Sequence, residues 1–104
     1  MVSINATPVV AALAAAGDVS GWFPTSQGAP FNAWVLSGSW QGALYLEFAP
    51  AGATTGVPIV VGATRLYSFT QPGKMPVEEY EAGVRVRFKA GDTFSGSANV
   101  RISA

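Results

Sequence analysis

Short segments in which apolar and polar residues alternate recur along this sequence at intervals of about ten residues, separated by glycine and proline. The clearest segment is VRVRFK, residues 84–89, where valine or phenylalanine alternates with arginine or lysine. A period of two residues is typical of a β-strand that buries one face. About seven or eight such strands predict an all-β fold, either a single antiparallel β-sandwich or a jelly-roll-like barrel.

The length of 104 residues predicts one domain, 1–104, in which residues 1–8 form a possible extended N-terminal arm. Apolar residues make up 49% of the chain, which is enough to offset the entropy of ordering it. The alternating segments assign most of the core to eleven side chains: Phe31, Val35, Leu44, Leu46, Phe48, Leu66, Val84, Val86, Phe88, Val100 and Ile102.

The same patterns assign outward faces and turns. Ala43, Tyr45 and Glu47 form the surface face of strand 43–48, and Arg85, Arg87 and Lys89 form an exposed basic row. Asn99, Arg101 and Ser103 face outward on strand 98–103. Residues 38–42 connect a hairpin, 49–56 form a mobile loop, 57–61 and 64–70 are extended, and 71–74 form a turn. Pro58 lacks an N–H donor, which favours a sheet edge for its segment.

Two features leave alternatives open. Residues 7–17 carry the signals of a short helix, with Thr7 as N-cap, Pro8 at the first turn and Gly17 as stop. The β-branched pair Val9 and Val10 favours a strand, which we prefer. In addition, Ser37-Gly38-Ser39 is echoed by residues 95–97, an echo too short to be an internal repeat.

The sequence offers no catalytic, cofactor-binding or metal site. It contains no histidine and no cysteine, which excludes Ser-His-Asp and Cys-His chemistry. Glu78, Glu79 and Glu81 are best interpreted as a solvated strand entry with ion pairs to neighbouring strands. The remaining acids, Asp18, Glu47 and Asp92, are too scattered for a metal site. We therefore expect a protein that is not an enzyme and needs no cofactor.

Charge and aromatic content bear on partners. Six acidic and six basic residues cancel, which argues against nucleic acid or an anionic membrane as a partner. Low charge favours burial of surface against other proteins, although a stable monomer can tolerate it. Flat aromatic side chains could stack on a sugar ring or be buried as part of the core, and exposure of the tryptophans distinguishes these two interpretations. The aromatic side chains concerned are Trp22, Trp34, Trp40, Tyr45, Tyr67 and Tyr80.

Two stretches, PFNAWVLSGSWQGALYLEF and YEAGVRVRFKAGDTFSGSANVRIS, carry a resemblance to small virion proteins of tailed bacteriophages. The resemblance spans roughly residues 9–103, while residues 49–56 depart from the family pattern, so no role of that loop is carried over. The matching positions are Ser37, Gly38, Ser39, Trp40, Gly42, Glu81, Gly83, Arg87, Ser95, Gly96, Asn99, Arg101, Ile102 and Ser103.

The resemblance implies a structural protein of the virion, assembled in the host cytoplasm, most plausibly a capsid decoration or cement protein. Its partners would be copies of itself in a homo-oligomer and other virion proteins such as the major capsid protein. The expected contact regions are Met1 to Pro8, Ala49 to Gly56 and the basic row. The alternative is a tail, neck or fiber-associated module that binds carbohydrate or the host surface.

Overall fold

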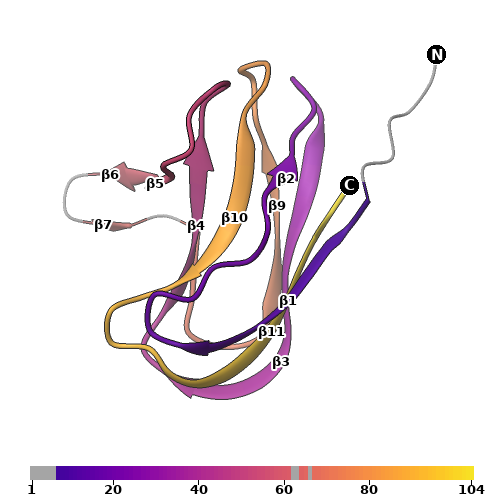
Figure 1. The fold of residues 1–104 in the computed structure, drawn as a ribbon. Helices are drawn as coiled ribbons and strands as arrows, with labels where there is room; N and C mark the ends of the chain where they lie inside the picture. Colours follow the sequence, from indigo (N-terminus) through magenta and orange to yellow (C-terminus); the bar gives the residue numbers. More distant parts are fainter. Residues whose placement is uncertain (1–6, 62–63, 66) are drawn as a thin grey trace.

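The computed structural model describes residues 7–61, 64–65 and 67–104, and every regular element within these ranges is a β-strand. Figure 1 labels the strands in chain order. They are β1 (Val9–Ala15), β2 (Phe23–Pro24), β3 (Pro30–Gln41), β4 (Leu44–Ala49), β5 (Val57–Pro58), β6 (Val60–Val61), β7 (Thr64–Arg65), β8 (Ser68–Phe69), β9 (Gly73–Glu78), β10 (Arg85–Ala90) and β11 (Ser95–Ser103).

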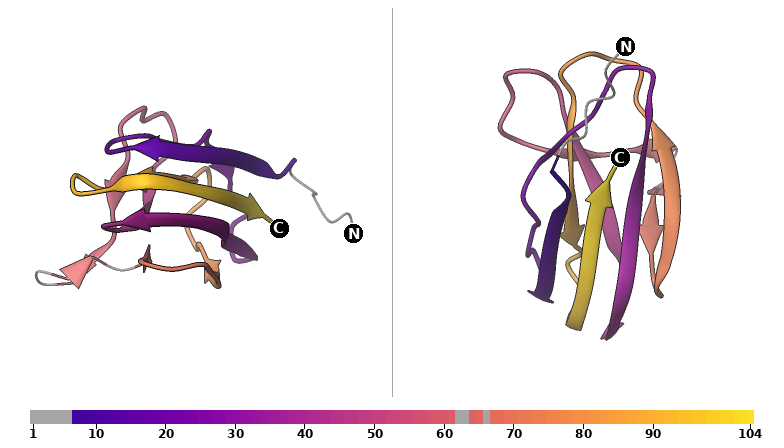
Figure 2. Two further views of the ribbon diagram at one scale, coloured as in Figure 1. Left: turned by 90° about the horizontal axis from the view of Figure 1, so that it is seen from below. Right: turned by 90° about the vertical axis from the view of Figure 1, so that its right-hand side faces the viewer.

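Two antiparallel sheets pack face to face and form a sandwich (Figure 1). The first sheet has the order β1-β11-β3-β9, and these four strands lie side by side in the left view of Figure 2. The second sheet has the order β2-β10-β4-β5, with β8 also paired to β4. β6 and β7 form a separate two-stranded ribbon that projects from the sandwich.

The connectivity of these strands is that of a jelly roll. The chain crosses from one sheet to the other between β1 and β2, β2 and β3, β3 and β4, β8 and β9, β9 and β10, and β10 and β11. The pairs β1 with β11, β2 with β10, β3 with β9 and β4 with β5 lie side by side, as in a long hairpin rolled up on itself. The predicted all-β sandwich is therefore confirmed, and the strand count is higher than expected because β5 to β8 are two-residue pieces.

The core lies between the two sheets. All the predicted core residues that the structure describes are buried, while Leu66 lies outside the described residues. Further buried side chains come from segments without clear alternation, including Leu13, Phe23, Phe69 and Phe94. Aromatic rings connect the elements: the Phe69 and Phe88 ring centroids are 5.8 Å apart.

Residues 9–15 form a strand, as preferred, and the helical alternative is wrong. β1 pairs antiparallel with β11, from Val9 opposite Ile102 to Leu13 opposite Ala98. Leu13 is buried in the core, whereas Val10 on the opposite face is 64% exposed. The alternating environment suits a strand because successive side chains point to opposite faces of a sheet.

The predicted hairpin connection at 38–42 is wrong, since β3 continues to Gln41. β3 pairs with β11 along its length, with Gly38 opposite Ala98 and Gly96 opposite Trp40. Gly38 has φ +140°, and a Cβ there would lie 2.3 Å from the Ser97 carbonyl oxygen. A Cβ at Gly96, where φ is +110°, would lie 2.3 Å from the Ser39 carbonyl oxygen. The echoed Ser-Gly motifs thus sit on neighbouring strands, where each glycine admits the other strand's backbone.

Of the three other segments near sheet edges, one lies where it was predicted and two differ from the prediction. Pro58 lies in β5 at the end of the second sheet, which confirms the predicted edge. Residues 64–70 are not one strand, because Tyr67 has φ +55° and interrupts the extended backbone. Strand β9 begins at Gly73, where a turn was predicted, and pairs with β3 from Pro30 opposite Glu78 to Val35 opposite Gly73.

Candidate functional site

An ion-pair cluster on the outer face of the second sheet is the most strongly charged buried feature. Glu47 is 3% exposed, which corrects its predicted place on a surface face. Its Oε1 accepts a hydrogen bond of 2.9 Å from Arg87 Nε, and its Oε2 lies 3.6 Å from Lys89 Nζ. Tyr45, predicted to lie on the same surface, is also buried. The cross-strand register of β4 with β10 places these residues together, with Arg87 opposite Glu47.

Trp22 and the loop after β4 cover this cluster. The Arg87 guanidinium carbon lies 4.3 Å from the Trp22 ring centroid, and that of Arg85 lies at 5.2 Å. Arg85 also donates a hydrogen bond to the Ala53 carbonyl. A Cβ on Gly56 would lie 2.9 Å from both Trp22 and the Glu47 carboxylate. The side chains of the basic row are therefore partly buried and engaged within the molecule, which corrects their predicted full exposure. Their role as a contact region stays a prediction.

The aromatic side chains named as a possible sugar-binding set are dispersed. Trp22 covers the second sheet, while Trp34 lies on the outer face of the first sheet. Trp40 is half-buried against the core, and its buried Nε1 has no hydrogen-bond partner among the described residues. Tyr67 contacts Phe48 with ring centroids 5.9 Å apart. Among the described residues, therefore, no row of coplanar exposed tryptophans forms.

The glutamates near residue 80 lie at the solvent-exposed end of β9. Glu79 Oε2 accepts a hydrogen bond of 3.0 Å from the Glu81 amide. The carboxylate of Glu78 raises the pKa of the Tyr80 phenol, first by charge repulsion of the phenolate and then by accepting a hydrogen bond from the phenol O–H. Within the described ranges, no three acidic side chains gather in a way that could hold a metal ion.

The edges of the two packed sheets differ in how they are protected. β2 and β5 contain only two residues each, and each includes a proline, Pro24 or Pro58. β9 carries Lys74, Pro76 and Glu78. Short edges, prolines and charges are the usual obstacles to addition of a further strand.

β1 has none of these obstacles. Its seven residues, VVAALAA, are uncharged, and in the described structure β11 is its one neighbour in the sheet. At one end, the Asp18 carboxylate accepts hydrogen bonds from the Ala14 and Ala15 amides, at 2.9 and 3.0 Å. The open edge therefore runs from Val9 to Leu13, and Val10 is its exposed apolar side chain.

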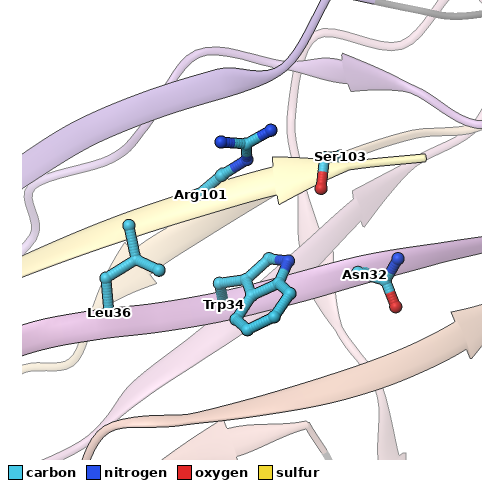
Figure 3. A pocket seen from close by; sticks show the side chains of 5 residues that line it. All are labelled: Asn32, Trp34, Leu36, Arg101 and Ser103. Carbon is cyan, nitrogen blue, oxygen red and sulfur yellow. The ribbon is translucent and has the colours of Figure 1, made fainter.

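A shallow pocket lies on the outer face of the first sheet, over its two central strands. Its volume is about 360 Å³, and Figure 3 shows the five lining side chains on β3 and β11: Asn32, Trp34, Leu36, Arg101 and Ser103. Arg101 stands opposite Trp34 in the register, and Lys74 of β9 stands opposite Trp34 on its other side. The Lys74 ammonium lies 5.0 Å from the Trp34 ring centroid.

A second hollow, about 200 Å³, lies between the sheets near the end of β9. Phe48, Ile59, Tyr67, Val77, Glu78 and Glu79 line it. This hollow is smaller than the pocket at Trp34, and most of the side chains that line it are apolar.

Sequence reasoning identified Trp34 and Arg101 separately but not their juxtaposition, which depends on the pairing of β3 with β11. Ser103 faces outward, as predicted, and lines the pocket, although it is only 9% exposed. The unprotected edge of β1 could have been inferred, since VVAALAA contains neither charge nor proline.

Any function has to be inferred from the fold and from these surfaces, because comparison with known proteins gives no match. No family model, no curated protein and no solved structure matches this chain. In the part of the chain that the structure describes, no helix is long and apolar enough to cross a membrane.

Proposed function

We propose that this chain is a structural component of a bacteriophage particle, a capsid decoration protein that binds neighbouring proteins through the β1 edge. The observation that carries the proposal is this unprotected, uncharged edge, which offers unpaired backbone donors and acceptors to another strand. The assignment of this role to a phage particle rests on the sequence resemblance to phage virion proteins. The jelly-roll connectivity is compatible with this role, since capsid domains often use it, but lectins share it.

The strand edge alone is too small for a stable contact. A stable interface takes on the order of 800 Å² from each partner, and the described chain exposes 5731 Å² in total. The open part of β1, Val9 to Leu13, is about 17 Å long at 3.3 Å per residue. The contact must therefore extend beyond the edge of β1, where Val10 is 64% exposed, and a second copy of the chain is the simplest partner.

The test uses two matched substitutions. Val10→Lys places a charge on the β1 edge, whereas Val57→Lys places the same charge on β5, at a valine that is 55% exposed. Sedimentation velocity of the wild-type chain should show an oligomer, Val10→Lys should shift it to monomer, and Val57→Lys should leave it unchanged. Cosedimentation with capsids and with tails of the encoding phage then identifies the position in the particle.

Two results would contradict the proposal. If the wild-type chain is monomeric and binds neither capsids nor tails, it is not a structural component of the phage particle. Equal loss of assembly in both lysine variants would show that β1 is not the contact.

A further inference from the structure

We infer that the pocket on the outer face of the first sheet binds a carboxylated sugar residue, such as a uronic or sialic acid, at Trp34 and Arg101. The inference goes beyond the proposed particle role and is tested with the isolated chain. It rests on the charges around the pocket, on the chemistry of its lining and on its position in the sheet.

The pocket is positively charged although the chain has no net charge. Arg101 and Lys74 flank Trp34 from the two neighbouring strands. Within the described residues, the ion pairs are those of Glu47 with Arg87 and Lys89, so neither Arg101 nor Lys74 has a carboxylate partner. Glu78, on the same strand as Lys74, lies four residues away, about 13 Å along an extended chain. An anionic ligand would therefore meet two cations here.

The lining matches a sugar acid better than a simple anion. The half-buried Trp34 ring is an apolar surface against which the C–H face of a sugar ring can pack, beside the Lys74 ammonium that lies over the ring 5.0 Å from its centroid. Asn32 and Ser103 supply groups that both donate and accept hydrogen bonds, as sugar hydroxyls require. The Arg101 guanidinium can bind a carboxylate through two parallel hydrogen bonds. A volume of about 360 Å³ lies at the lower end of ligand pockets and suits a small ligand.

The position of the pocket argues against a peptide. β3 and β11 are the two central strands of the sheet, so their backbone groups are already paired with neighbouring strands. A peptide that adds to a sheet needs free backbone groups at an edge. A ligand here must be recognised by side chains, which is how a sugar with its hydroxyls and its carboxylate would bind.

The experiment is an amide and indole NMR titration of the purified chain. The probes are methyl β-glucuronide and 2-O-methyl sialic acid, which separate the two kinds of sugar acid. Methyl β-glucoside has the ring without the carboxylate, and acetate has the carboxylate without the ring. At least one acidic sugar should shift the Trp34 indole and the Asn32 side-chain amide, and methyl β-glucoside and acetate should bind at least tenfold more weakly.

Substitutions assign the effect to the pocket. Arg101→Gln, at an exposed residue, and Trp34→Ala should each lower the affinity at least tenfold. Ser97→Ala is the matched control, because Ser97 is exposed on the same strand four residues away. If Trp34→Ala fails to fold, Arg101→Gln and the shift map of the wild-type chain still decide the question.

Several outcomes would overturn the inference. The absence of shifts at Trp34 with both acidic sugars would remove the site. If acetate binds as tightly as the acidic sugars, the pocket is a simple anion site. If methyl β-glucoside binds as tightly as the acidic sugars, Arg101 does not recognise the carboxylate. A penta-glutamate peptide that gives the same shifts at lower concentration would assign the site to an acidic protein partner.

Discussion

Replacing Gly38 with alanine should destabilise the sandwich severely, because β3 and β11 approach each other at this glycine. The new Cβ would lie 2.3 Å from the Ser97 carbonyl oxygen and 2.7 Å from the Ala98 Cα, whereas ordinary contact begins at 3.4 Å. Both obstacles are backbone atoms, so no side-chain rotation relieves them. The backbones of the two strands must separate by roughly 1 Å at this point to restore ordinary contact.

The cost has two parts. A φ of +140° is a conformation that residues other than glycine adopt at about 1 to 3 kcal/mol. Separation of the strands weakens the ladder hydrogen bonds on either side, about two bonds each worth about 1 kcal/mol net. The sum, about 3 to 5 kcal/mol, is a large part of the 5 to 15 kcal/mol typical of a domain. It corresponds to a melting temperature lower by roughly 15 °C or more.

Two further glycine-to-alanine variants separate these contributions. Gly52 has φ +82° with no atom within 4 Å of a new Cβ, so Gly52→Ala measures the backbone cost alone, about 1 to 2 kcal/mol. Gly73 has neither a positive φ nor a close neighbour, so Gly73→Ala should be neutral or stabilising by up to about 1 kcal/mol. The measurement is urea unfolding followed by circular dichroism. If Gly38→Ala unfolds no earlier than Gly52→Ala, the close approach of β3 and β11 is refuted.

Three other predictions test the core, the ion-pair cluster and a perturbed phenol. Leu46→Ala should lower the free energy of unfolding by about 2 to 4 kcal/mol through lost burial and a cavity, whereas Leu36→Ala, at an exposed position, should cost well under half of that; similar costs would contradict the assigned core. Glu47→Gln should cost about 1 to 3 kcal/mol in thermal unfolding at neutral pH, because it leaves two partly buried cations without their counter-charge, and a neutral effect would contradict this role. The Tyr80 phenol should ionise at higher pH than a free tyrosine in an ultraviolet titration, because the neighbouring carboxylate opposes the phenolate, and Glu78→Gln should return it toward the ordinary value; an unchanged midpoint would exclude this cause.

Strict alternation predicted most of the core correctly. Val84, just before β10, and Val86 and Phe88 within it are buried, because a period of two places them on one face of the extended chain whatever its neighbours are. The strand at residues 9–15 was also correctly preferred, because Val9 and Val10 disfavour a helix. These features depend on local sequence.

The errors concern contacts between distant segments. Glu47 and Tyr45 look like surface residues within their own strand. Glu47 is buried beside Arg87 and Trp22, and Tyr45 lies between its partners on β10 and β8. Residues 38–41 look like a turn because of their glycine and serine, yet the glycine permits the approach of β11. The pocket at Trp34 and Arg101 likewise requires the register of two strands more than sixty residues apart in the chain. Periodicity and turn propensity contain no information on that register.

The pairing of β1 with β11 affects the order in which this protein can fold. Val9 pairs with Ile102, so β1 has no partner in its sheet until the last strand has been synthesised. β3 likewise cannot pair before β9 and β11 have been synthesised, because both of its neighbours in the sheet follow it in the chain. The first sheet therefore cannot be completed before β11 has been synthesised, and its apolar strands stay partly uncovered until then. Such non-local pairing is typical of domains that fold in milliseconds to seconds. During this interval the unprotected β1 segment of one nascent chain could pair with that of another, so the yield of soluble protein should depend on the rate of synthesis.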